Sequence, residues 1–100
     1  MKVKWTATAR KHLRGVHDYV AADSPAYARR LVDRLTRRTE QLESFPESGG
    51  KVLEYDDPMI RELLEGPYRI IYRVRPNRVD ILAVIHSARQ LPEDPPPAMS

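Results

Sequence analysis

Apolar side chains along this chain follow first the spacing of helices and then the spacing of strands. Residues 2–6 alternate apolar and polar positions, which predicts a short half-buried strand. Residues 7–22 place apolar side chains three and four positions apart, the pattern of one helix face. Ser24 and Pro25 suit the N-cap and first position of a second helix, whose apolar positions continue to Phe45, just before Pro46. The first half therefore predicts a strand and a helical hairpin.

The second half predicts strands separated by short turns. Residues 59–64, 68–75 and 78–85 are rich in β-branched and aromatic side chains, and Gly66-Pro67 and Pro76-Asn77 separate them. Residues 51–54 are consistent with a further short strand. Since such turns are too short for a crossover connection, the strands are expected to pair antiparallel. The fold class predicted is α+β, with an N-terminal strand, a helical hairpin and an antiparallel sheet of three to four strands.

Strand alternation divides the central strand into two faces. One face holds Tyr68, Ile70, Tyr72 and Val74, and the other holds Arg69, Ile71, Arg73 and Arg75. The first set is expected to pack beneath the helices. The second set predicts a basic, partly exposed sheet surface, to which Arg61 and Arg89 contribute, and arginine suits carboxylates and phosphates. The alternative is that these arginines only cover apolar strands with their stems and keep their heads in water.

Length and composition favour one globular domain. The 100 residues are 41% hydrophobic and 31% charged, which is typical of a folded domain, here placed at residues 1–91. Residues 92–100 are rich in proline and are expected to form a flexible tail unless bound. No cysteine is present, so disulfides and thiolate metal sites are excluded, and no apolar run approaches membrane-spanning length. A cytoplasmic protein is therefore expected.

The net charge of +3 conceals a strong asymmetry along the chain. Residues 1–39 carry ten basic against three acidic side chains, whereas residues 40–57 carry one against six. Much of the basic excess falls on the second predicted helix, and it includes Arg30, Arg34 and Arg37. These side chains either solvate the outer face of that helix or form a docking surface for an acidic partner or RNA.

Few motifs of known chemistry occur. The chain lacks the glycine-rich phosphate loops, the zinc-protease motif and the nucleophile elbow, and no metal or cofactor is expected. His86 lies at a predicted strand end near Arg89 and has the side chain suited to proton transfer near neutral pH. A single histidine without an identified partner is more often structural.

Six motifs in this order resemble the ParE branch of the ParE/RelE toxins of type II toxin–antitoxin modules. They are W-x-x-x-A, Y-V-x-x-x-S-P-x-x-A, L-x-x-F-P-x-x-G, R-E-L, P-Y-R-I-I-Y-R-V and V-I-H-x-A-R, spread over about residues 5–91. The resemblance implies a small toxin that is neutralised by a cognate antitoxin, ParD-like or of another small type, in a hetero-oligomer. ParE members of the family act on DNA gyrase, and RelE members cut messenger RNA on the ribosome.

Residue types favour the gyrase branch. In RelE-like nucleases, lysines on the strand before the Y-R-L-V-Y motif, arginines in and after it, and a late tyrosine or histidine carry the reaction. Here Arg69 and Arg89 match those arginines and His86 is a candidate acid or base, so these three are the catalytic candidates if the chain is a ribonuclease. The preceding strand, however, offers Ile60 and Glu62 in place of lysines. A gyrase inhibitor needs only a surface, and the non-catalytic interpretation is therefore preferred.

Partner binding is assigned to the arginines of the sheet and of the second helix. Segments that fold on binding place an apolar face against their partner and add ion pairs around it. The residues predicted to bind a partner are Arg61, Arg69, Arg73, Arg89, Arg30, Arg34 and Arg37. A third alternative is a non-toxic chain that acts only as corepressor with a DNA-binding antitoxin.

Overall fold

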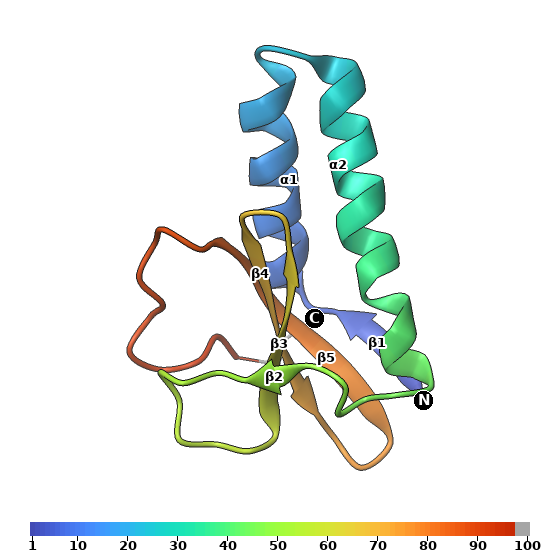
Figure 1. Ribbon diagram of the computed structural model, residues 1–100, viewed down its shortest axis with the longest axis vertical. Coiled ribbons are helices and arrows are strands. Elements are labelled where there is room, and N and C mark those ends of the chain that lie inside the picture. The colour runs from blue at the N-terminus through green and yellow to red at the C-terminus, as the bar shows by residue number, and fades with distance from the viewer. Residues whose placement is uncertain (98–100) are drawn as a thin grey trace.

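The computed structural model describes residues 1–97 and has a helical hairpin packed on one face of a five-stranded sheet (Figure 1). Its elements are β1 (Lys2–Trp5), α1 (Ala7–Ala21), α2 (Pro25–Arg38), the 3-10 helix η1 (Glu40–Glu43), β2 (Gly50–Lys51), β3 (Ile60–Glu65), β4 (Tyr68–Val74) and β5 (Arg78–His86). The α+β class and the order of elements predicted from the sequence are confirmed. Within residues 1–97, neither helix has the length and apolar character that crossing a membrane requires.

Side-chain caps fix where both helices begin. The Thr6 hydroxyl accepts a hydrogen bond from the Ala9 amide at the start of α1, and Ser24 does the same for Tyr27 at the start of α2. Pro25 occupies the first turn of α2, where its missing N–H costs nothing.

The second helix ends earlier than its apolar pattern predicts. α2 stops at Arg38, because the buried Thr39 turns its hydroxyl back to the Thr36 carbonyl at 2.8 Å and the chain continues as η1. The change of helical period rotates later positions. Leu42 is buried, whereas Phe45, the last apolar position of the predicted helix, is 67% exposed.

The sheet has the order β1-β5-β4-β3-β2, and only β1 pairs in parallel. Gly66 has φ +55° at the first position of the β3–β4 turn, a value that side chains with a Cβ rarely adopt. Pairing of β4 with β5 shifts between Ile71 and Tyr72, which forms a bulge. The strand expected over residues 51–54 is limited to Gly50–Lys51. Counting β1 and β2, the sheet has five strands where three to four were predicted.

Two apolar clusters lie on opposite faces of the sheet. On the helix-covered face, Tyr68, Ile70, Tyr72 and Val74 pack in one cluster with side chains of both helices, which confirms the alternation predicted for β4. On the other face, called the outer face below, Ile71 joins a smaller cluster with Val52, Tyr55, Ile60 and Ala83. Part of the outer face is thus covered by the segment before β3, so the surface predicted to be partly exposed is smaller than the strand itself.

The start of the proline-rich tail lies against the domain. Leu91 packs on the outer-face cluster, and the Tyr55 hydroxyl donates a 2.8 Å hydrogen bond to the Pro92 carbonyl. Residues 98–100 of the predicted flexible tail lie outside the described residues.

Candidate functional site

Arg69 lies between two carboxylates on the outer face. Its Nη1 and Nη2 donate to Glu54 at 2.7 and 2.9 Å, and its Nε and Nη2 donate to Glu62 at 2.6 and 3.3 Å. All three nitrogens are therefore occupied, and the side chain is only 13% exposed. Register places Glu62 diagonally across from Arg69 on the neighbouring strand, since Leu64 pairs with Arg69 and Glu62 with Ile71. We call these three residues the Arg69 cluster.

The electrostatics of this cluster are those of a closed ion-pair network. Hydrogen bonds from Arg69 lower the pKa of Glu54 to about 2, against a smaller opposing effect of desolvation. The same carboxylates, Glu54 first and then Glu62, raise the pKa of Arg69 above its ordinary value. One guanidinium against two carboxylates leaves the cluster net negative. The prediction of a basic surface is wrong at this position, because acidic side chains from two other segments neutralise the arginine.

Arg73 also has an intramolecular partner. Its Nη1 donates to the Asp57 carboxylate at 2.8 Å, and Asp57 accepts a further bond from the Met59 amide at 2.9 Å. The pKa of Asp57 is lowered, first by the Met59 amide and then by Arg73. Arg73 keeps 24% of its side chain exposed, so it is held in place but still reaches solvent.

Arg61 lies on the helix-covered face and not beside Arg69. Side chains alternate between the two faces along β3, so Arg61 lies on the face opposite Ile60 and Glu62. It shares the face of Leu63, which packs in the cluster beneath the helices. Its Nη1 donates to the Gly49 carbonyl at 3.0 Å, and its buried Nε has no hydrogen-bond partner among residues 1–97. The expectation that Arg61 extends the outer arginine surface is therefore wrong.

Gly49 allows this approach because it has no side chain. A Cβ there would lie 2.4 Å from the Glu62 carbonyl oxygen and 2.6 Å from the Tyr72 hydroxyl, which accepts the Gly49 amide at 2.9 Å. The hydrogen bond from Arg61 to the Gly49 carbonyl thus holds the segment that leads into β2 against the sheet.

His86 ends β5 and Arg89 lies three residues later, but the two side chains contact different parts of the protein. His86 stacks edge-on against Tyr68, with ring centroids 5.5 Å apart, and its Nδ1 accepts the Ala88 amide at 3.1 Å. Pairing of His86 with Tyr68 and of Ile85 with Arg69 puts the histidine and Arg69 on opposite faces. The three candidate ribonuclease residues are not brought together.

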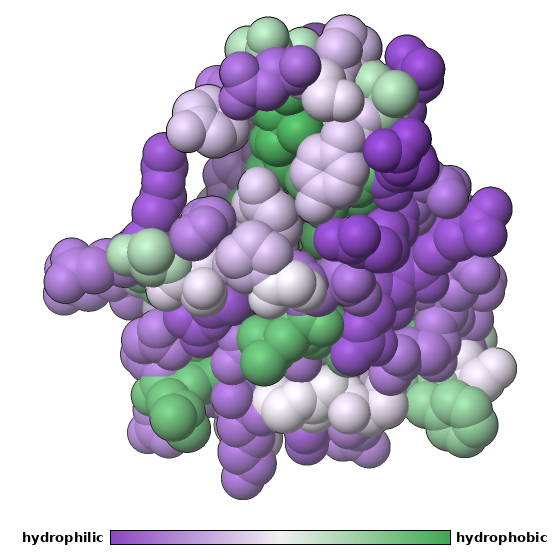
Figure 2. All heavy atoms as spheres, turned by 45° about the horizontal axis from the view of Figure 1, so that its top comes forward, coloured by the Kyte–Doolittle hydropathy of each residue, from purple (hydrophilic) through white to green (hydrophobic). Residues whose placement is uncertain are grey.

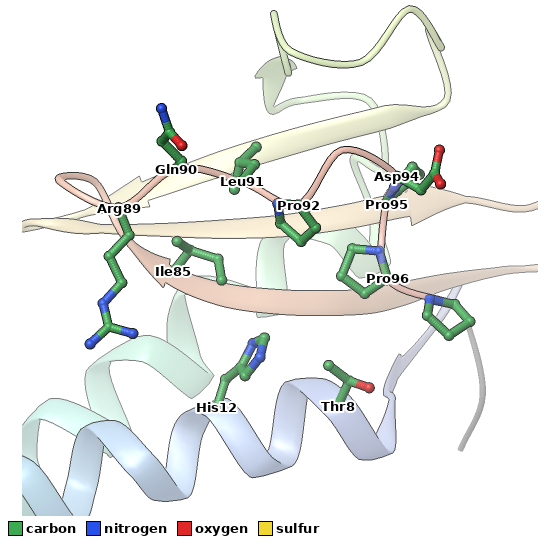
Figure 3. Close-up of a pocket in the computed structure, with 11 residues that line it drawn as sticks. Thr8, His12, Ile85, Arg89, Gln90, Leu91, Pro92, Asp94, Pro95 and Pro96 are labelled. Atoms are coloured by element: carbon green, nitrogen blue, oxygen red, sulfur yellow. The ribbon is translucent and has the colours of Figure 1, made fainter.

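Arg89 lines an open pocket of about 740 Å³ between α1, the end of β5 and the tail (Figure 3). Its side chain points toward the side of α1 from which Thr8 and His12 rise. His12 Nδ1 accepts the Val84 amide at 3.2 Å and so satisfies a donor on the β5 edge that β1 leaves unpaired. Burial, and then the nearby Lys11, lower the pKa of His12 and favour the neutral ring that this bond requires. Within the described residues, Arg89 forms no ion pair.

The arginines of α2 differ in how tightly they are held. Arg34 pairs with Glu65 at 3.0 Å and Arg37 with Asp33 at 3.1 Å, while Arg30 lies 5.9 Å above the Tyr27 ring. The Arg37 side chain is 72% exposed, so an ion pair there is weak and leaves the charge accessible. Arg34 instead links α2 to the end of β3.

An apolar surface near the free end of the helical hairpin was not predicted. Both helices extend beyond the sheet there (Figure 1), so Val16 and Val20 remain only partly buried, and Tyr19 and Tyr27 are exposed at 83% and 42%. Figure 2, which brings this end forward, shows hydrophobic residues (green) surrounded by hydrophilic ones (purple). We call these four residues the hairpin apolar surface. The two tyrosines that flank the hairpin turn in the sequence were the available signal.

Comparison with known proteins identifies the family of this chain. A model of the ParE toxin of the parDE type II toxin–antitoxin system matches residues 3–91. The chain belongs to the ParE toxin family. It is a toxin of the type II toxin–antitoxin class, and the resemblance seen in the sequence is confirmed.

Two relatives of this ParE-family chain are both named as toxins. The putative toxin Y4kP of Sinorhizobium fredii is 30% identical over 94 residues, covering 92% of this chain and 94% of the relative. Toxin RelE2 of Caulobacter vibrioides is 34% identical over 89 residues, covering 88% and 97%.

Two solved structures share the fold of this ParE-family chain. The chromosomal ParDE system from P. aeruginosa superposes with a TM-score of 0.72 at 27% identity, covering 86% of this chain and 95% of the other. The RelBE2 toxin–antitoxin complex from Mycobacterium tuberculosis gives a TM-score of 0.57 at 26% identity, covering 85% and 95%.

Proposed function

We propose that this toxin acts in the cytoplasm by inhibiting DNA gyrase and has no ribonuclease activity. The supporting observation is the Arg69 cluster. Cleavage of RNA needs a cation that stabilises charge developing on the scissile phosphate. Both terminal nitrogens and the Nε of Arg69 already bind Glu54 and Glu62, so a phosphate approaching there would meet two carboxylates. A protein that blocks gyrase by contact needs no such group.

The position of His86 supports the same proposal. A general acid or base must reach the proton that it transfers, within hydrogen-bond distance or through one water. His86 lies against Tyr68, on the face opposite Arg69, and no carboxylate among the described residues orients its ring.

Two assays run side by side test the target. We expect the purified toxin to inhibit supercoiling by gyrase and to leave messenger RNA intact in a cell-free translation reaction. His86→Ala should inhibit gyrase as the unmodified toxin does, because His86 is exposed and has no assigned role in the contact. Cleaved messages that disappear with His86→Ala, together with unaffected supercoiling, would establish the ribonuclease instead.

We also propose an acidic antitoxin as the partner of this toxin in a hetero-oligomer. An amphipathic segment would place its apolar side on the hairpin apolar surface and pair its carboxylates with Arg30 and Arg37, whose charges reach solvent. Arg34, Arg73 and Arg89 lie outside the hairpin apolar surface and are further candidates for contact with the antitoxin, whereas Arg61 and Arg69 are already engaged within the toxin.

Co-expression with the product of the adjacent small gene tests this partner. We expect the toxin alone to arrest growth and the pair to yield a stable complex. Arg30→Glu combined with Arg37→Glu should weaken the complex on the order of tenfold or more, since like charges would then face each other. Arg14→Glu, an exposed change on α1, is the control and should leave the affinity within about twofold. Normal growth without co-purification would contradict the proposal.

A further inference from the structure

A second group of basic side chains lies at the other end of the outer face, around the turn between β4 and β5 (bottom of Figure 1). The pairing of β1, β5 and β4 brings these side chains together. Lys2 pairs with Arg78, and Asp80 lies between Lys4 and Arg73 on the neighbouring strands. The alternate positions Val3, Trp5, Val79 and Ile81 pack toward the helices, so the charged side chains project outward. We call Lys2, Lys4, Arg73, Arg75 and Arg78 the hairpin-end basic surface.

Asp80 organises two of these cations from a buried position. Its side chain is 1% exposed and accepts the Nε of Arg78 at 2.8 Å and the Nε of Arg75 at 3.2 Å. Burial alone would raise the pKa of Asp80, but the bonds from Arg78 and Arg75 outweigh it and keep the pKa low, so the carboxylate is charged at neutral pH.

The two guanidiniums are fixed on one side and available on the other. Arg75 and Arg78 each bind Asp80 through Nε, and their terminal nitrogens have no hydrogen-bond partner among residues 1–97. Their side chains are 39% and 40% exposed. A pair of forks held by a shared buried acceptor loses little freedom when it binds an anion.

The composition of this surface favours phosphates over a peptide. Five cations face only two carboxylates, Asp57 and Asp80, over about 10 Å from β1 across β5 to β4. The outward positions of these strand segments hold charged side chains alone, and Trp5 points into the core. A peptide needs an apolar anchor and a single nucleic acid strand needs an aromatic platform, and neither is offered here.

We propose that the hairpin-end basic surface binds the phosphate backbone of duplex DNA, with Arg75 and Arg78 as the phosphate-binding pair and Asp80 as their positioning residue. The choice of DNA rests on the proposed function, since gyrase acts on duplex DNA. The contact is expected to be independent of base sequence, because hydrogen bonds to phosphates carry no sequence information.

Fluorescence anisotropy of a short duplex DNA, with toxin alone and no gyrase, tests the proposal. We expect a Kd on the order of 10⁻⁶–10⁻⁴ M that weakens steeply between about 50 and 200 mM salt. Arg75→Gln combined with Arg78→Gln should weaken binding at least about tenfold and reduce the salt slope by about 2. Lys2→Gln with Lys4→Gln leaves the Asp80 pairs intact and should lower the slope similarly, which provides a second reading if the arginine variant does not fold.

Variants with equal changes of charge elsewhere on the protein distinguish binding at the hairpin-end basic surface from nonspecific electrostatic attraction to DNA. Lys11→Gln with Arg14→Gln removes the same charge from exposed positions of α1 and should leave the salt slope unchanged. Asp80→Asn adds net positive charge, so charge counting predicts tighter binding, whereas loss of positioning predicts binding weaker by about threefold or more. An α1 variant as damaging as the arginine variant, or an Asp80→Asn variant that binds more tightly, would overturn the proposal.

The same assay identifies the class of ligand. Duplex RNA that binds more tightly than duplex DNA, or a polyglutamate peptide that displaces DNA at equal charge, would contradict the assignment to DNA. Because gyrase is absent, failure of this binding is distinguishable from failure of gyrase inhibition, which the supercoiling assay measures by itself.

Discussion

The two ends of the outer face hold arginines in opposite ratios to carboxylates. In the Arg69 cluster one guanidinium meets two carboxylates and is 13% exposed. At the hairpin end two guanidiniums, Arg75 and Arg78, share the single carboxylate of Asp80 and keep about 40% exposure. An arginine whose every nitrogen is paired is part of the structure, while one paired only through Nε still has donors for another molecule. The pairing decides the role more than the residue type does.

The largest difference between the two ends is expected from removal of the arginine at each. Arg69→Gln removes the cation from the largely buried Glu62 and leaves it beside the second carboxylate of Glu54, which should destabilise the fold by about 3 kcal/mol and lower Tm by about 10–20 °C. Arg75→Gln leaves Asp80 with Arg78, and a loss below about 1 kcal/mol is expected. Thermal and urea unfolding measure both. Equal losses would show that the two ends do not differ in role.

A smaller loss of stability is expected when the carboxylate of Asp80, at the hairpin end of the outer face, is replaced. Asp80→Asn removes the buried negative charge and replaces one of the two oxygens that accept from Arg75 and Arg78 with an NH2 donor, but both arginines reach water and can be solvated. We expect a loss of about 1–2 kcal/mol with the fold retained, measured by urea unfolding and circular dichroism. The conservative variant Asp80→Glu should recover part of the loss. A loss as large as that of Arg69→Gln would mean that Asp80 is mainly a structural group.

Hydrophobic period and capping residues were enough to predict most of the fold. Ser24 and Pro25 marked the start of α2, and alternation in β4 gave its two faces correctly. The parallel pairing of β1 with β5 was not predictable, because period identifies a strand but not its neighbour. The orientation of β3 was ambiguous for a different reason. Ile60 and Leu63 put apolar side chains on both faces of the strand, so its pattern does not show on which face Arg61 lies.

The ion pairs were hidden because they join distant segments. Glu54 and Arg69 are 15 residues apart, and they meet only because the chain before β3 folds over the outer face. Asp80 was equally difficult to interpret, since a lone acid among arginines in the sequence resembles ordinary surface charge. Burial distinguishes Asp80, and it arises only once the fold brings Lys4 and Arg73 of the neighbouring strands to either side of it.

The smallest effect concerns acid pH and isolates Glu54 within the Arg69 cluster. The pKa of Glu54 is about 2 in the folded protein against an ordinary 4.5, so its stabilising effect is fully present above pH 4.5 and is lost as pH falls toward 2. Since the side chain is 44% exposed, screening by water limits the effect at neutral pH to below about 1 kcal/mol. Glu54→Gln should therefore be slightly less stable than the unmodified toxin at pH 7, with the difference vanishing toward pH 2. Urea unfolding across this range measures it, and Glu40→Gln, an exposed change in η1, is the control. A Glu54→Gln variant that is more stable than the unmodified toxin at pH 7 would mean that the folded state raises the pKa of Glu54, and the Arg69 cluster would then not be the closed ion-pair network described.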